Sequence, residues 1–239
     1  MIPKYNRDKY YRIINMAQSN YANQFKRISK DAKRADFVLI YYSLSLIVYN
    51  LSTKFYPNLF AEDWISYSSV ILSIIVLIYS IINSKAGYPG RIHTLEKALN
   101  RTKRLKRDVG ELPDRIPQDC PASRCQGCEG DGQCIRLESL KEEYDKLVSS
   151  TEIRDDIDFY YTIQHLCKQY HINIRTGEYK GKDKDDKPSD DVHQEIKGYI
   201  SENKPLLQKF HVVANGFWHF CLYVAPVVIF ILGYFFSNR

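Results

Sequence analysis

The sequence predicts an all-α membrane protein with three transmembrane helices and a cytoplasmic helical hairpin domain. Three observations predict this fold class: three long apolar stretches, clusters of Lys and Arg beside them, and a helical spacing of apolar residues in the polar segment before the third stretch. The mean hydropathy of the whole chain is only −0.39. This average is low because the 34 Lys and Arg and the 28 Asp and Glu lie almost entirely outside the apolar stretches.

Two of the apolar stretches lie close together and predict a two-span hairpin over residues 37–84. They run from Phe37 to Lys54 and from Trp64 to Ser84, and neither has a charged side chain before its end. The third stretch, residues 212–236, has no acidic or basic side chain apart from the neutralisable His219. About 20 such residues cross the roughly 30 Å hydrocarbon core of a bilayer. Uncharged runs of this length are rare in small soluble domains, so we interpret all three as membrane spans.

Basic residues beside the spans predict their orientation. Residues 1–36, predicted as a basic N-terminal helix, hold nine Lys and Arg, whereas the connection from Phe55 to Trp64 holds none and includes Glu62 and Asp63. Eight more Lys and Arg follow the second span, up to Arg107. Because Lys and Arg concentrate on the cytoplasmic side, we expect a cytoplasmic N-terminus and an outside C-terminus. The first apolar run begins too late for a cleavable signal peptide, so it is expected to act as its own anchor.

Residues 85–211 are predicted to form the cytoplasmic helical domain. Residues at the 3-4 spacing of one helix face occur in two segments, first Leu95, Ala98, Thr102, Leu105, Val109 and Leu112, and then Leu137, Leu140, Tyr144 and Leu147. Two antiparallel helices fit this pattern, with the Pro- and Gly-rich residues 113–134 as the tip of the hairpin. A further helix is expected from Glu152 to about Tyr170, a flexible charged linker at residues 177–191, and a last helix that starts at Pro205.

The hairpin tip contains four closely spaced cysteines in a C-x4-C-x2-C-x5-C pattern: Cys120, Cys125, Cys128 and Cys134. On the cytoplasmic side thiols stay reduced, and four thiolates this close together can form a tetrahedral zinc site. One structural zinc ion is therefore the cofactor that we expect. The spacing of the first three cysteines also matches plant-type iron–sulfur ligands, and free or redox-sensing thiols are a further alternative. His165, Cys167 and His171 lack ligand spacing and are interpreted as ordinary helix residues.

Several short motifs, together with this architecture, resemble the SLATT family, a two-transmembrane effector domain that associates with SMODS and SLOG. The chain has a basic N-terminal helix, two spans with a very short connection, and then the segment SKAGYPGRIHTLEKAL, in which Arg91, His93 and Glu96 belong to the family motif. The segment from Asp155 to Ile172, DDIDFYYTIQHLCKQYHI, and the third span are similar to the subgroup found beside reverse transcriptases.

The resemblance implies a membrane effector of a bacterial anti-phage system that is held inactive until infection. Such an effector is expected to assemble, form a pore or disrupt the inner membrane, and arrest the infected cell. The resemblance also implies a homo-oligomer in the lipid bilayer of the bacterial inner (plasma) membrane. The expected partner in the defence system is a reverse transcriptase or the product of a nucleotidyltransferase.

Hydroxyl residues in the first two spans are the candidates for assembly or for lining a pore. They form one stripe on each helix, namely Tyr42, Ser45, Tyr49 and Ser52, and then Ser66, Ser69, Ser73, Ser80 and Ser84. Small hydroxyl residues let helices approach closely and bond to each other, within one protomer or between protomers. Hydroxyls can also line a water-filled path, so a pore lining is the second interpretation.

The third span contains polar and helix-breaking residues at membrane depth. Asn215 and His219 lie one helical turn apart, and Pro226 interrupts the backbone hydrogen-bond ladder. An ionisable group at this depth is a candidate functional residue. His219 also lies beside Trp218 in the inner half of the span, where a position at the membrane interface is the simpler interpretation. Pro226 is expected to kink the helix.

The sequence contains no catalytic signature, so we do not expect an enzyme. It lacks a Gly-rich phosphate loop, an H-E-x-x-H motif and a G-x-S-x-G motif. The alternative to an effector is a membrane-anchored sensor or regulatory subunit whose hairpin binds a partner protein or nucleic acid. Its binding surface would be a basic stripe made of Arg101, Lys103, Arg104, Lys106 and Arg107. Basic runs near a membrane also contact lipid headgroups, which is the simpler explanation of this stripe.

Overall fold

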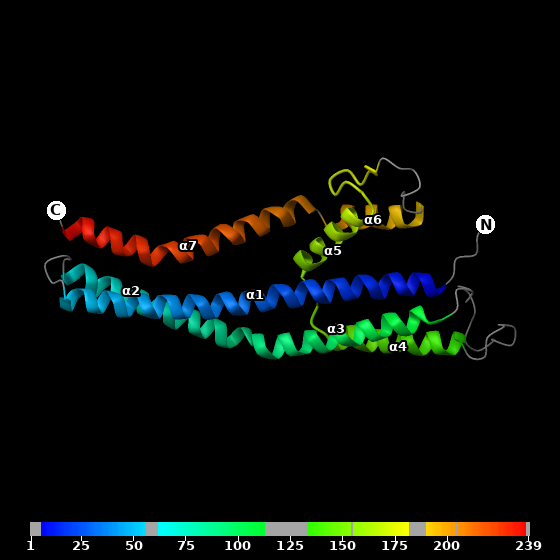
Figure 1. Cartoon of the computed structure of the whole chain (residues 1–239), viewed down its shortest axis with the longest axis horizontal. Helices are drawn as coiled ribbons and strands as arrows, with labels where there is room; N and C mark the ends of the chain where they lie inside the picture. Colours follow the sequence, from blue (N-terminus) through cyan, green and yellow to red (C-terminus); the bar gives the residue numbers. More distant parts are fainter. Residues whose placement is uncertain are drawn as a thin grey trace. The chain divides into compact units, whose positions relative to one another are not determined.

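The computed structural model describes residues 6–55, 62–112, 133–153, 155–181, 190–203 and 205–237, which form seven α-helices (Figure 1). In chain order they are α1 Asn6–Phe55, α2 Glu62–Ala86, α3 Tyr88–Gly110, α4 Gln133–Ser150, α5 Asp156–Gln169, α6 Asp190–Asn203 and α7 Pro205–Ser237. Within these ranges there is no β-strand, and the β-type pairing is one isolated bridge between Ile172 and Tyr179. The predicted all-α class is confirmed.

In the described part of the chain, three helical stretches are long and apolar enough to cross a membrane. The apolar parts of α1, α2 and α7 form them. Large apolar side chains are exposed along all three, among them Ile40, Leu44, Ile74, Leu77, Phe217 and Phe220. Apolar side chains that line whole helix faces in this way favour lipid over water as their surroundings. The chain is therefore a membrane protein with three candidate spans, as the sequence predicts.

The predicted N-terminal helix and first span are one continuous helix. Helix α1 has 50 residues, and neither Gly nor Pro occurs within it. Without these two residues the backbone has no local reason to leave the helical conformation where the composition changes from charged to apolar. By contrast, α2 and α3 are separated at Gly87, whose φ of 57° is the left-handed conformation that ends many helices.

The chain divides into two compact units. The first, here called the polar unit, comprises Met1–Arg27 and Gly90–Gln208. The second, here called the membrane unit, comprises Ile28–Pro89 and Lys209–Arg239.

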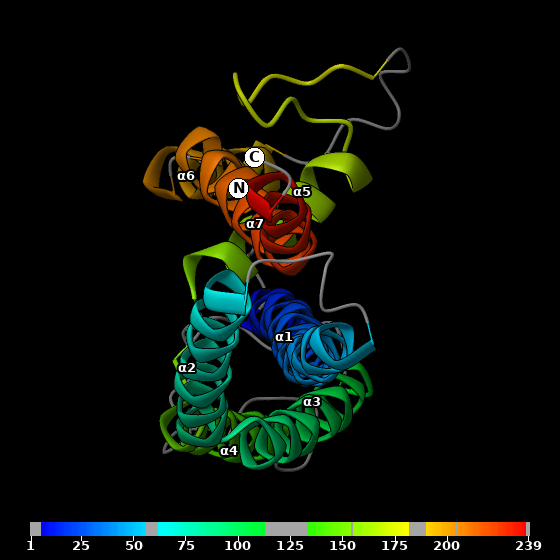
Figure 2. The same cartoon turned by 90° about the vertical axis from the view of Figure 1, so that its left-hand side faces the viewer.

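In the polar unit, α3 and α4 lie side by side (Figure 1 and Figure 2) and form the antiparallel hairpin that the sequence predicts. Ion pairs along its length run from Arg91–Glu152 through Arg101–Glu143 to Arg136–Glu111, so the residue numbers rise on one helix as they fall on the other. The predicted seam is buried: on α3 and just after it Leu95, Ala98, Thr102, Leu105, Val109 and Leu112, and on α4 Leu137, Leu140 and Leu147. Tyr144 is half-buried. The residues of the predicted tip up to position 132 lie outside the described ranges.

A second apolar core of the polar unit joins α5 and α6. It is built from Phe159, Ile163 and Cys167 on α5, Ile196 and Ile200 on α6, and Ile172 between the two helices. The predicted flexible linker, residues 177–191, has ordered residues at both of its ends. Residues 177–181 continue an ordered turn in which the Lys180 amide donates to the His171 carbonyl at 2.7 Å, and α6 already begins at Asp190. Residues 182–189 of the predicted linker lie outside the described ranges.

The membrane unit has a small core in which tyrosines are prominent. Val38, Tyr42 and Tyr49 of α1 and Leu72 of α2 are buried there, and Tyr223 and Phe230 of α7 pack against them. The Tyr49 and Phe230 rings meet edge to face with their centroids 5.3 Å apart. Aromatic pairs of this geometry add stability beyond their buried area, so they help to hold the first and third spans together.

Candidate functional site

The membrane unit places two tyrosines of the first span against the proline of the third. Pro226 lacks an N–H group, so the carbonyl four residues earlier, on Leu222, loses its helical hydrogen bond. The Tyr42 hydroxyl donates to this carbonyl at 2.8 Å. One turn further along α7, the Pro226 carbonyl accepts a hydrogen bond from the Tyr49 hydroxyl at 3.2 Å. We call Tyr42, Tyr49, Leu222 and Pro226 the tyrosine–proline contact.

This contact gives the predicted hydroxyl stripe of the first span a local role. Tyr42 and Tyr49 are buried, whereas Ser45 and Ser52 are half-buried and donate to carbonyls of their own helix, those of Tyr41 and Val48, both at 2.8 Å. An unpaired carbonyl in lipid is costly, since no water is present to bond it. Sequence reasoning marked Pro226 and both tyrosines separately and did not pair them. The signal that the two tyrosines share is a polar hydroxyl among apolar neighbours.

The serine stripe of the second span lies outside the packed face of its helix. Ser66, Ser73, Ser80 and Ser84 are exposed, and Ser69 is half-buried. The packed face of α2 instead carries Ser68 and Leu72, which are 2% and 0% exposed, together with the half-buried Ile75, Val76 and Tyr79. The hydroxyls of Ser69 and Ser73 donate to carbonyls of their own helix at 3.0 and 2.8 Å. Four of the five serines are thus exposed, and the hydroxyls of Ser69 and Ser73 are hydrogen-bonded within their own helix.

Ser68 is the serine of the second span that sequence reasoning missed. It lies four residues before Leu72 and eleven before Tyr79, which is the spacing of one helix face. The spacing of Ser68, Leu72 and Tyr79 can be read from the sequence, but several apolar faces of α2 have the same spacing. Periodicity alone does not select among them.

The polar pair in the third span is engaged within its own helix. His219 Nδ1 lies 2.9 Å from the Asn215 carbonyl, a contact in which the ring nitrogen donates. The His219 side chain is half-buried and Asn215 is exposed. The contact joins the His219 ring to the Asn215 backbone, as their spacing of one helical turn allows.

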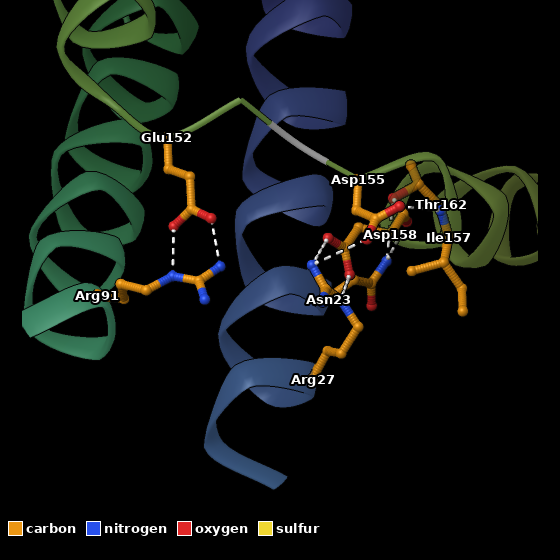
Figure 3. Close-up of polar contacts among 8 residues, drawn as sticks. All are labelled: Asn23, Arg27, Arg91, Glu152, Asp155, Ile157, Asp158 and Thr162. Atoms are coloured by element: carbon orange, nitrogen blue, oxygen red, sulfur yellow. Dashed lines mark hydrogen bonds and ion pairs between the residues drawn. The ribbon is translucent and has the colours of Figure 1, made fainter. Parts of the chain in front are cut away.

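In the polar unit, a buried carboxylate holds α5 against α1 (Figure 3). Asp158, which is 0% exposed, accepts from Arg27 Nε and Nη2, both at 2.9 Å. Asn23 Nδ2 donates to Thr162 Oγ1 at 3.0 Å, and Thr162 in turn donates to the Asp158 carbonyl at 3.2 Å. We call Asn23, Arg27, Asp158 and Thr162 the Asp158 network. A bidentate pairing of this kind with Arg fixes orientation as well as distance.

The residue immediately before α5, Asp155, also takes part in the contacts around Arg27. Asp155 caps α5 with a side chain that accepts from the Ile157 amide at 3.5 Å, and it lies 3.7 Å from Arg27 Nη2. An acidic side chain at this position is favoured by the unpaired N–H groups and the dipole of the helix. Asp155 and Asp158 both belong to the DDIDFYYTIQ segment of the family-like motif.

The three residues of the other motif do not converge. Arg91 makes a bidentate ion pair with Glu152, with Nε 2.9 Å from Oε2 (Figure 3). His93 and Glu96 are exposed on α3. Within the polar unit, the arginine therefore joins the start of α3 to the end of the α4 segment.

The basic stripe on α3 is largely paired with acidic or polar groups. Arg101 contacts Glu143 at 2.9 Å, and Arg104 contacts Asp108 at 3.6 Å. Lys106 donates to Asn15 Oδ1 at 2.7 Å. The acidic partners of Arg101 and Arg104 offset part of the positive charge that a nucleic-acid backbone would require, so these two arginines give little support to the sensor alternative.

The predicted zinc ligands lie largely outside the described ranges: Cys120, Cys125 and Cys128 precede α4, and Cys134 is the second residue of that helix. Within the described residues, no group of three or more His, Cys, Asp or Glu has a metal-binding geometry. Cys167 is buried in the α5–α6 core, and burial raises the pKa of its thiol to about 11. His165 is exposed on α5, whereas His171 follows the helix with φ 52°, so the interpretation of His171 as a helix residue is wrong.

Comparison with protein families identifies the chain. Residues 21–233 match the family described as SMODS and SLOG-associating 2TM effector domain family 5, SLATT_5. The match includes the second candidate span, most of the first and third, and the Asp158 network, and the chain belongs to this family. No curated protein and no solved structure matches the chain.

Proposed function

We propose that this SLATT chain is a membrane effector of a bacterial anti-phage system that self-associates in the inner membrane, permeabilises it and arrests the infected cell. The family supports an effector that acts at a membrane. The single observation that carries the self-association is the position of the serine stripe, Ser66, Ser69, Ser73, Ser80 and Ser84, beside the packed face of α2 rather than within it.

An exposed serine stripe suits contact between copies of the chain. Small hydroxyl residues allow close approach of helices, and the internal hydrogen bonds of Ser69 and Ser73 let α2 insert before a partner arrives. The three candidate spans found among the described residues are too few to surround a water-filled path. A pore therefore requires symmetric repetition of the chain around an axis, with the same stripe placed at each interface or along the lumen.

The remaining features of the proposal follow from the charges and the family. The polar unit lies in the cytoplasm together with the N-terminus, and the C-terminus lies outside. The trigger is a partner in the same defence system, either a reverse transcriptase or the product of a nucleotidyltransferase. The proposed activity needs no catalytic step, because a pore dissipates gradients that the cell already maintains.

Replacement of Ser69 and Ser73 by Leu tests the proposal. The double variant is more apolar, so it should still insert, but it loses the hydroxyls and the close approach that they allow. We expect it to reach the membrane at the level of the unsubstituted chain and to lose both membrane depolarisation and growth arrest. Depolarisation is measured with a potential-sensitive dye after induced expression in cells.

Ser43→Leu is the matched control, because Ser43 is an exposed serine of the first span outside both stripes. It should depolarise the membrane like the unsubstituted chain. If the Ser69→Leu, Ser73→Leu chain is inserted, assembles and depolarises as the control does, the stripe is not the assembly or lining surface.

A further inference from the structure

The polar unit contains a pocket of about 390 Å³ between α1, α3 and α5. On α5 its lining residues are Thr162, His165, Leu166 and Gln169, which share one helix face. Helix α1 contributes four lining residues, and α3 contributes Lys106. The volume lies in the range of ordinary small-molecule sites, about 300–1,000 Å³.

The charges that line this pocket are positive. Arg12 and Lys106 are the charged residues of the lining, His165 lies beside them, and no carboxylate belongs to the lining. Glu195 contacts Arg12 at 3.6 Å from outside the lining and offsets part of one charge. Such a pocket attracts an anion, and a guanidinium together with an ammonium group suits the oxygens of a phosphate.

The ammonium group of Lys106 is held in place without a ligand. Its Nζ donates to Asn15 Oδ1 at 2.7 Å and lies 5.4 Å from the centroid of the Tyr11 ring. Neither contact neutralises the charge, since an amide and an aromatic ring are both uncharged. A positioned cation costs less conformational entropy on binding than a freely moving lysine.

The pocket also offers aromatic and hydrogen-bonding groups beyond the two cations. The rings of Tyr11 and Tyr170 line it, as do the polar side chains of Asn15, Ser19 and Gln169. Tyrosine rings provide faces on which a planar base can stack, and amides and hydroxyls suit the edges of a base or a sugar. A bare phosphate ion would leave these groups unused.

We propose that this pocket binds a nucleotide, with the phosphate near Arg12 and Lys106 and the planar base beside Tyr11 or Tyr170. This ligand site deepens the proposed function, in which the product of a nucleotidyltransferase is one of the two triggers, but the binding test below does not depend on the membrane activity. Thr162 belongs both to the pocket lining and to the Asp158 network. A bound nucleotide would thus contact a side chain that helps to hold α5 against α1.

Calorimetric titration of the full chain, purified in detergent, tests the site. The probes are the four common ribonucleoside monophosphates, each up to about 1 mM, with adenosine and inorganic phosphate as the two partial ligands. We expect saturable binding of at least one monophosphate and at least tenfold weaker binding of both partial ligands. Hydrogen exchange should show ligand protection of amides in residues 11–19 and 162–170.

Lys106→Ala should weaken nucleotide binding at least tenfold, and Lys103→Ala, an exposed lysine of the same helix outside the pocket, should leave it unchanged. Because Lys106 also contacts α1, His165→Ala at an exposed helix position provides a second variant that should weaken binding without affecting the fold. Absence of saturable binding by every monophosphate overturns the proposal, as does equal binding by Lys106→Ala and Lys103→Ala. Inorganic phosphate that binds as tightly as the best nucleotide would overturn the assignment to nucleotides.

Discussion

At the scale of single residues, the tyrosine–proline contact shows how the third span tolerates Pro226. A proline inside a helix leaves one carbonyl without its usual donor, and in lipid no water replaces it. Tyr42 supplies the missing donor from α1, because its hydroxyl reaches the Leu222 carbonyl at 2.8 Å. The break in the helix thereby becomes a specific point of attachment between two spans.

Tyr42→Phe should destabilise the membrane unit by about 1 kcal/mol, because it removes only the hydroxyl and leaves the Leu222 carbonyl unpaired. The measurement is the unfolding midpoint in mixed micelles of increasing denaturing detergent. Tyr67→Phe is the control, since Tyr67 is 64% exposed on α2, and its midpoint should remain that of the unsubstituted chain. Equal midpoints for the two variants would show that the hydrogen bond contributes no net stability.

At the scale of helices, contacts along α3 and α4 define how the two helices pair in the hairpin. The buried seam and the three ion pairs along it specify an antiparallel register from Arg91 to Arg136. In the sequence, the four cysteines fall at the connection between α3 and α4, so binding of a metal ion would be coupled to formation of this connection.

The tip should carry about one zinc ion per chain when the protein is purified under reducing conditions, because four closely spaced thiolates satisfy tetrahedral coordination. Cys125→Ser with Cys128→Ser should remove the metal, as measured by elemental analysis. Cys167→Ser is the control, since Cys167 is buried in the α5–α6 core, and it should retain the metal. A metal-free unsubstituted chain would eliminate the zinc proposal. We expect the double variant to stay in the membrane, since the spans do not include the tip.

At the scale of the whole molecule, the charge distribution divides the chain into two kinds of surface. The membrane unit exposes rows of large apolar side chains, and the polar unit carries many ion pairs, including a buried one at Asp158. Helix α1 contributes residues to both units. The excess of Lys and Arg before the first span and after the second then predicts which side of the membrane the polar unit occupies.

Labelling of intact cells with a membrane-impermeant thiol reagent should follow this orientation. Asn58→Cys, in the short connection between the first two spans, should react above the level of the unsubstituted chain, because this connection is expected outside. Lys184→Cys, in the polar segment before the third span, should react only after the cells are opened. Reaction of Lys184→Cys in intact cells would reverse the proposed orientation while leaving the three spans in place.

The three candidate spans and the seam of the α3–α4 hairpin could be predicted from the sequence. These features depend on hydropathy and periodicity within one helix, which neighbouring residues specify without reference to the rest of the chain. Leu95, Leu105 and Leu147 are buried as their spacing predicts. The family-like segments also lie in the sequence itself, and residues 21–233 match the family.

Which helix faces and side chains contact each other could not be predicted from the sequence and follows from the packing of the helices. Tyr42 and Leu222 are 180 positions apart, and Arg27 and Asp158 are 131 apart, so no local pattern relates them. The same holds for α2, where Ser68 faces the core and the more conspicuous serine stripe does not. The physical reason is that helix rotation and pairing follow from the shapes of all the packed faces together, whereas the spacing of residues along one helix allows several faces equally well.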